Sequence, residues 1–176
     1  MDSHDLGSIL NPKILADANR IAARFRSAPP FPNLVIDDFF QRDFVNRLYV
    51  EFPSFEQGNR MGDNGQLGGK STMEKIRGLG PAFRALDAAI QTPQFLKLLS
   101  RITGIEGLLY DPWYLGGGTH ENHGGMSLDP HVDFNYHPSE RWHRRLNLLL
   151  YLNPTWEPHW GGGFELFRGP PGSGRP

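Results

Sequence analysis

An alternating run near the C-terminal end of the chain constrains the fold most. Residues 144–153 read RRLNLLLYLN. Side chains of an extended strand point alternately to its two faces. One face would therefore be all leucine, made of Leu146, Leu148, Leu150 and Leu152. This pattern predicts a strand with its leucine face in a core. Asn147 and Tyr151 would lie on the other face, either binding an acidic ligand or merely lining a half-exposed sheet.

A His-x-Asp tripeptide precedes this run, formed by His131, Val132 and Asp133. In an extended strand the imidazole and the carboxylate project from the same side. Such a pair supplies two of the three ligands of the 2-His-1-carboxylate sites that hold non-haem Fe(II). The tripeptide alone is weak evidence, because His-x-Asp occurs by chance in many chains.

The order of the motifs resembles a known family. HVDFN, then RRLNLLLYLN, then a tryptophan and GGGFELF are similar to the Fe(II)- and 2-oxoglutarate-dependent oxygenases of the prolyl-4-hydroxylase type. Upstream, NLVIDDFF, TPQFLKLLSRITGI and YDPWYLGGGTHENHGG resemble the N-terminal half of bacterial members, so the likeness covers nearly the whole chain. It implies a dioxygenase that hydroxylates a prolyl or other amino-acid or peptidyl carbon, with release of succinate and CO2.

The resemblance also implies a role for individual residues. His131 and Asp133 would hold Fe(II) together with a distal histidine, and O2 and 2-oxoglutarate would join them, with ascorbate a further cofactor that the family allows. Tyr151 would hydrogen-bond the distal carboxylate of 2-oxoglutarate, with Asn147 as its neighbour. In the family, the distal histidine and a basic anchor for that carboxylate lie beyond the GGGFELF segment. Neither is found before Pro176, so we expect a truncated member with an unidentified third ligand.

Three further residues are candidates for contact with a substrate. His120, Glu121 and His123 lie in THENHGG, where they would meet a polar substrate or simply form a tight turn between strands. The alternative function belongs to a different class: the chain would be a non-catalytic, truncated jelly-roll fragment that acts only as a binding module. A zinc hydrolase-like site is the weakest alternative, because the chain has no HExxH motif.

Composition excludes several other classes. The formal net charge is −1 and no long basic run occurs, which argues against nucleic-acid or anionic-membrane partners. The chain has no cysteine, so disulfides, thiolate ligands and a cysteine nucleophile are absent. The sequence shows no secretory signal and no apolar window long enough to span a bilayer. We therefore predict a cytoplasmic protein; its oligomeric state stays open.

The 176 residues predict one α+β domain with a helical first half and a β-rich second half. Residues 1–107 would be a mainly helical support region, 108–168 jelly-roll strands that carry His-x-Asp, and 169–176 a loop or tail. The family implies a double-stranded β-helix, or jelly roll, incomplete at its C-terminus, with the N-terminal helices packed on the major sheet.

Local signals place the elements of the first half. Asn11-Pro12 and Thr92-Pro93 are helix starts, and Gly104 ends the second of these helices. Another helix is expected over 81–90, a short strand over 34–36, and a Gly-rich mobile loop over 57–70. The first helix should present an apolar stripe made of Ile14, Leu15, Ala18, Ile21, Ala22 and Phe25.

Overall fold

The structure of the 176-residue chain is a computed structural model. It describes residues 6–54, 56, 59–61, 67–124 and 131–169. Two compact units are found, and each is built from two separate stretches of the chain: Met1–Glu51 with Ile76–Pro112 in unit 1, and Phe52–Lys75 with Trp113–Pro176 in unit 2. The predicted single oxygenase domain stays a prediction. In the described part, no helix is long and apolar enough to cross a membrane.

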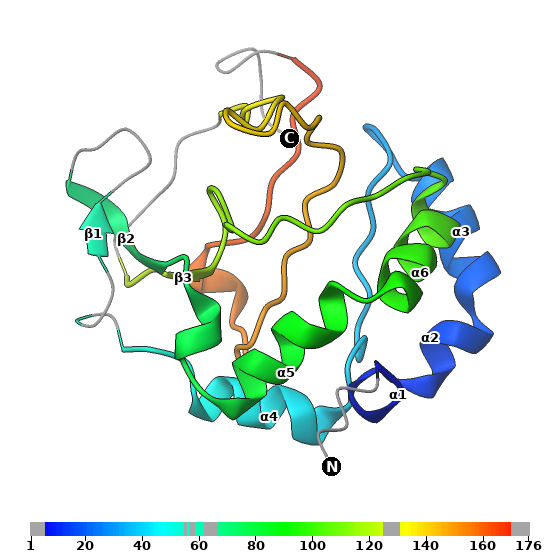
Figure 1. Ribbon diagram of the computed structural model, residues 1–176. Helices are drawn as coiled ribbons and strands as arrows, with labels where there is room; N and C mark the ends of the chain where they lie inside the picture. The colour runs from blue at the N-terminus through cyan, green and yellow to red at the C-terminus, as the bar shows by residue number, and fades with distance from the viewer. Residues whose placement is uncertain (1–5, 55, 57–58, 62–66, 125–130, 170–176) are drawn as a thin grey trace. The chain divides into compact units, whose positions relative to one another are not determined.

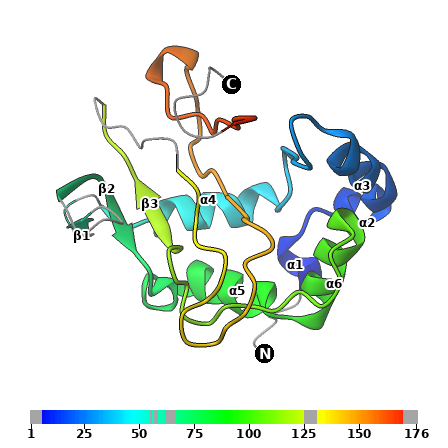
Figure 2. The same cartoon turned by 90° about the horizontal axis from the view of Figure 1, so that it is seen from above.

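Unit 1 is helical, as expected for the first half of the chain. Its helices are α1 (Leu6–Ile9), α2 (Pro12–Ala16), α3 (Ala18–Ser27), α4 (Arg42–Val50), α5 (Pro81–Ile90) and α6 (Pro93–Thr103), with the 3-10 helix η1 (Ile76–Gly78) before α5. Helices α3 and α6 lie side by side in both views (Figures 1 and 2). The largest fully buried side chains of the described residues belong to this unit: Phe44, Phe95, Leu10 and Leu48.

Capping explains where these helices begin and end. The Asn11 side chain accepts a hydrogen bond from the Lys13 amide at 3.1 Å, and the Thr92 hydroxyl accepts one from the Phe95 amide at 3.2 Å. Both bonds satisfy amides that have no partner within the first helical turn. Gly104 ends α6 with a φ of 74°, in the left-handed region that glycine adopts without strain. The predicted starts and the predicted stop are confirmed.

The predicted apolar stripe of the first helix is only partly correct. Ile14, Ala18, Ile21 and Ala22 are buried, but Leu15 is 50% exposed. A turn at Asp17 separates α2 from α3, although the Asp17 amide donates to the Lys13 carbonyl oxygen at 2.9 Å and the Ile21 amide donates to the Asp17 carbonyl oxygen at 3.0 Å. The buried residues keep helical spacing from α2 into α3, and Leu15 lies outside the buried stripe.

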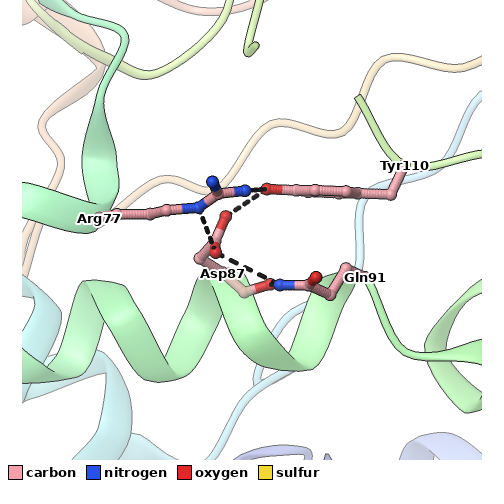
Figure 3. A network of polar contacts seen from close by, with 4 residues as sticks. All are labelled: Arg77, Asp87, Gln91 and Tyr110. Carbon is pink, nitrogen blue, oxygen red and sulfur yellow. Dashed lines mark hydrogen bonds and ion pairs between the residues drawn. The ribbon is translucent and has the colours of Figure 1, made fainter. Parts of the chain in front are cut away.

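A network of polar side chains links three parts of the Ile76–Pro112 stretch of unit 1 (Figure 3). Asp87 on α5 is only 5% exposed. Its carboxylate accepts hydrogen bonds from Arg77 Nε at 2.7 Å, Gln91 Nε2 at 3.3 Å and the Tyr110 hydroxyl. Arg77 Nη2 also donates to the Tyr110 oxygen at 2.8 Å. Hydrogen bonds to Asp87 and then to Tyr110 raise the pKa of Arg77 above its ordinary value. The network ties η1, α5 and the segment at Tyr110 together.

Unit 2 contains a small antiparallel sheet, in the strand order β1-β2-β3. The strands are β1 (Asn59–Met61), β2 (Leu67–Met73) and β3 (Thr119–Glu121), and Ser71 pairs with Glu121. Figure 2 shows the three strands together. Gly118 precedes β3 with a φ of +93°, and a Cβ there would lie 2.3 Å from the Met73 carbonyl oxygen. Only glycine fits this approach without a shift of backbone.

The sheet corrects two sequence-based expectations. Part of the predicted 57–70 loop is β-structure, since 59–61 and 67–70 pair within the sheet; residues 57–58 and 62–66 lie outside the described residues. The predicted strand over 34–36 is wrong, because this segment has no ladder partner. The pairing in that region is instead an isolated bridge between Leu10 and Phe40.

The alternating run over 144–153 is also not a strand in the structure. Two members of its leucine face, Leu148 and Leu150, are 53% and 38% exposed. Alternation specifies which side chains would share a face, but a strand also needs a partner for its backbone groups. Within residues 131–169 the structure shows one isolated bridge, between Tyr136 and His143, and the 3-10 helix η2 (Pro158–Trp160).

The observed architecture is therefore a set of helices plus a small antiparallel sheet. This agrees with the α+β class. A jelly roll is not seen among the described residues, which contain the three-stranded sheet alone. The expected packing of the N-terminal helices on a major sheet stays a prediction.

Candidate metal and cofactor site

A reversal of the chain after Asp133 builds the site. The Arg144 amide donates to the Asn135 carbonyl oxygen at 2.8 Å. The isolated bridge joins Tyr136 to His143, whose rings stack with centroids 4.9 Å apart. Backbone pairing and stacking thus bring the start of the alternating run back beside the His-x-Asp segment.

His137 supports the turn of this reversal. Its side chain is buried near Trp113 and Trp142, with ring centroids 5.2 Å and 6.2 Å away. The Glu140 amide donates to His137 Nδ1 at 3.2 Å. These contacts give His137 a structural role in the turn, apart from the His131 and Asp133 pair.

The structure brings His131 and Asp133 together. His131 Nε2 lies 3.8 Å from Asp133 Oδ1. The two residues do not belong to a strand in the structure, so the predicted strand is wrong, although the predicted approach of their side chains is observed. Their side chains are 45% and 39% exposed, and solvent reaches both.

The second oxygen of Asp133 accepts one hydrogen bond and takes part in one ion pair. Asn147 Nδ2 donates to Asp133 Oδ2 at 2.8 Å, and Arg144 Nη2 lies 3.2 Å from the same oxygen. Arg144 Nε also donates to Asn147 Oδ1 at 2.8 Å. The three side chains therefore form a closed cycle of two hydrogen bonds and one ion pair.

Arg144 contacts the candidate ligand Asp133, and the sequence reasoning missed this contact. In an alternating strand, Arg144 and Asn147 lie on opposite faces, so the period-two interpretation separated them. The structure replaces the strand by irregular backbone, and both side chains reach Asp133. The available signal was chemical: an arginine three residues before an asparagine, next to a segment with an acidic metal-ligand candidate.

The donor atoms of His131 and Asp133 suit two positions of one metal ion. First-row divalent ions bind imidazole nitrogen and carboxylate oxygen at about 2.0–2.2 Å. Two donors on one ion therefore lie about 3 Å apart when adjacent and about 4.4 Å apart when opposite, and the observed separation of 3.8 Å lies between these values. A nitrogen and an oxygen donor also match the ligand set that Fe(II) takes from proteins. Among the described residues, no group of three or more His, Cys, Asp or Glu side chains is placed to hold a metal.

Tyr151 lies further along the same segment. Its side chain is 53% exposed, and its ring meets that of Trp156 edge to face with centroids 5.8 Å apart. Trp156 contacts Trp160 in the same manner at 6.4 Å. The Tyr151 ring is thus packed against an exposed aromatic pair, and its predicted contact with a cofactor stays a prediction.

The three substrate candidates lie on and just after β3. His120 and Glu121 belong to the strand, and His120 pairs with Thr72 of β2. His123 Nε2 lies 3.6 Å from Glu121 Oε1. The structure therefore brings Glu121 and His123 together at the edge strand of the sheet, while the glycine after them at position 125 lies outside the described residues.

Comparison with known proteins gives one match. Residues 117–175, about a third of the chain, match the model of the 2OG-Fe(II) oxygenase superfamily. No curated protein and no solved structure matches the chain. The matched segment contains His131, Asp133, Asn147 and Tyr151. The match supports membership of this superfamily and a general oxygenase function, and the family implies the use of Fe(II), 2-oxoglutarate and O2 on a small-molecule or peptide substrate.

Proposed function

We propose that this chain carries the metal-binding part of an Fe(II)- and 2-oxoglutarate-dependent dioxygenase of the hydroxylase type. The observation that supports this most is the approach of His131 Nε2 to Asp133 Oδ1 at 3.8 Å. The pair lies inside the segment that matches the oxygenase family model. An imidazole and a carboxylate are two of the three ligands that a 2-His-1-carboxylate site requires.

In this proposal each residue has a defined task. His131 and Asp133 hold Fe(II), and the third ligand is not identified. When bound, Fe(II) with 2-oxoglutarate activates O2, so that one oxygen atom enters the substrate and the other ends in succinate as CO2 is released. Tyr151 donates a hydrogen bond to the distal carboxylate of 2-oxoglutarate, and Asn147 is its neighbour on the same segment. Ascorbate is an additional cofactor that the proposal accommodates.

The proposed substrate is a prolyl or other amino-acid or peptidyl carbon. His120, Glu121 and His123 are the residues that we propose to contact it. The 3.6 Å approach of His123 to Glu121 gives this edge of the sheet both an imidazole and a carboxylate. Such a pair can hydrogen-bond the amide groups of a peptide as donor and acceptor.

An anaerobic titration tests the proposal. Fe(II) and 2-oxoglutarate are added to the 176-residue chain, and the visible metal-to-ligand charge-transfer band of the ternary complex is followed. We expect a band from the native chain that is lost in His131→Ala and in Asp133→Ala. Asp17→Ala is the matched control, because this carboxylate is 42% exposed, belongs to unit 1 and has no part in the proposed ligand set. A folded native chain without any band would overturn the proposal for this chain.

The second candidate is a binding module without catalysis. The observation behind it is that the described residues bring together two metal-ligand candidates rather than three. This alternative predicts no charge-transfer band and no succinate, but retained binding of a peptide or protein partner. The same titration therefore separates the two functions.

A further inference from the structure

We infer that Arg144 and Asn147 are positioning residues that fix the Asp133 carboxylate so that only Oδ1 is presented to a metal ion. This inference rests on the proposed function, because it concerns the orientation of a proposed ligand. It assigns Arg144 a role that neither the motif pattern nor the family match gives it.

The two oxygens of Asp133 have different surroundings. Oδ1 faces His131 Nε2 at 3.8 Å. Oδ2 accepts a hydrogen bond from Asn147 Nδ2 at 2.8 Å and forms an ion pair with Arg144 Nη2 at 3.2 Å. A carboxylate can otherwise bind a metal through one or both oxygens. With Oδ2 held by a hydrogen bond and an ion pair, the metal is left with Oδ1, and one-oxygen coordination follows.

Arg144 also determines which end of the Asn147 amide faces Asp133. A side-chain amide can turn over, which exchanges its oxygen and nitrogen. Arg144 Nε has only a proton to offer and points at Asn147 Oδ1, 2.8 Å away. The amide nitrogen must then face the carboxylate, where it donates. Because this nitrogen carries two hydrogens, the bond to Asp133 leaves one for the proposed 2-oxoglutarate contact.

Arg144 is itself held in place by contacts on other sides. Its guanidinium carbon lies 4.5 Å from the centroid of the Phe134 ring, a favourable position for a cation over an aromatic face. Its backbone amide donates to Asn135. Its side chain is only 23% exposed. The Arg144 guanidinium group is therefore held by the Phe134 ring, by its own backbone hydrogen bond and by contacts with Asp133 and Asn147. It has little freedom to move away from Asp133.

The test has to separate the charge of Arg144 from its geometry. A positive charge near the site opposes the binding of a cation, so complete removal of Arg144 changes two effects of opposite sign. Arg144→Lys keeps the charge but loses the planar fork that reaches Asp133 and Asn147 together. Asn147→Ala removes the amide without altering charge.

Co(II) binding in the presence of 2-oxoglutarate is the measurement, with the visible ligand-field bands of Co(II) as the readout. We expect Arg144→Lys and Asn147→Ala each to weaken Co(II) binding by roughly 10-fold to 100-fold, as is usual for residues that orient a ligand, and to change the band shape. The loss of Co(II) affinity in the double variant should be smaller than the sum of the two single losses, because Arg144 acts partly through Asn147. Arg145→Lys, at the exposed neighbouring position, is the matched control and should behave as the native chain.

The outcomes are distinguishable. If the native chain and Asp133→Ala bind Co(II) equally poorly, the proposed function fails and the inference fails with it. If Asp133→Ala loses binding while Arg144→Lys and Asn147→Ala retain native affinity and native band shape, the inference alone is overturned. Far-ultraviolet circular dichroism of each variant separates a local loss from unfolding.

A measurement without metal tests the geometry directly. The two side-chain amide protons of Asn147 give a nuclear magnetic resonance signal that is displaced by a carboxylate acceptor. We expect this signal to move in Asp133→Ala and in Arg144→Lys, and to stay in place in Arg145→Lys. An Asn147 signal that stays in place in both variants would show that the cycle of contacts does not form. This conclusion would hold whether or not the proposed function is correct.

Discussion

Asp87 shows what a single buried carboxylate contributes to unit 1. It is 5% exposed and accepts from Arg77, Gln91 and Tyr110. Asp87→Ala leaves these donors without their common acceptor. Because hydrogen bonds to a charged group are worth about 1.5–3 kcal/mol and Arg77 is half exposed, we expect a loss of about 1–3 kcal/mol in the free energy of unfolding. Urea denaturation measures it.

The control for this prediction is an exposed ion pair of the same unit. Arg20 and Asp17 lie 2.6 Å apart, but their side chains are 70% and 42% exposed. Exposed pairs contribute at most about 1 kcal/mol, so Arg20→Ala should change the urea midpoint much less than Asp87→Ala. Equal effects of the two substitutions would contradict the structural importance of burial at Asp87.

At the scale of residues, the sequence predicted part of the candidate site. The i, i+2 spacing of His131 and Asp133 brings their side chains together in any extended backbone, so their approach did not depend on a correct strand assignment. The approach of Arg144 did depend on it. Its contacts with Asp133 and Asn147 arise from a chain reversal, which a periodicity argument does not describe.

At the scale of elements, helix α6 allows the contribution of its N-terminal cap to the free energy of unfolding to be measured. The Thr92 hydroxyl accepts from the Phe95 amide at 3.2 Å. Thr92→Ala removes the acceptor and should lower the free energy of unfolding by about 1 kcal/mol, whereas Thr92→Ser should retain most of it. Thermal unfolding followed by circular dichroism compares the two. A serine variant as unstable as the alanine variant would assign the effect to the Thr92 methyl group instead.

The entry to β3 depends on a glycine. Gly118 has a φ of +93°, and an added Cβ would lie 2.3 Å from the Met73 carbonyl oxygen. Gly118→Ala should therefore cost more than about 1 kcal/mol and weaken the pairing of β2 with β3. Gly124→Ala is the matched control, since nothing lies within 4 Å of a Cβ there. Amide hydrogen exchange at Thr119 and Glu121 reads the pairing, and unchanged protection in Gly118→Ala would refute the prediction.

Helices were predictable because their signals are local. The Pro, Thr and Gly residues that delimit α5 and α6 act within one or two turns of the helix they bound. Strands were not, because a strand is stabilised by a partner distant in sequence. Strand β2 contains Gly and polar residues that read as a loop, while the alternating run has the composition of a strand but no described partner.

For the whole molecule, the interleaving of the two units matters most. The segment that matches the oxygenase family starts at residue 117 and contains β3, but β2 belongs to the Phe52–Lys75 stretch. A fragment of residues 113–176 should therefore leave β3 unpaired. We expect low amide protection at 119–121 in this fragment, and restored protection when residues 52–75 are joined to it through a flexible linker. Equal protection in both would contradict the pairing.

Predictions about the whole molecule succeeded where local sequence patterns were enough, and not where long-range strand pairing had to be known. The α+β class follows from the distribution of helix signals and glycine-rich segments, and the observed helices and small sheet agree with it. An oxygenase function follows from ordered motifs, and the match over residues 117–175 supports it. The jelly roll requires several long-range strand pairings that no local pattern specifies.

The pairing of Ser71 with Glu121 also bears on the order of folding. The chain must pass through the whole Ile76–Pro112 stretch of unit 1 between these two residues. Contacts between residues distant in sequence form slowly, whereas helices form fast from local contacts. Compaction of α5 and α6 shortens the intervening loop and lowers the entropy lost on closing it. Strand β3 should therefore join the sheet late, after these helices have formed. During synthesis, the backbone groups of β2 that pair with β3 stay unpaired until β3 has been made.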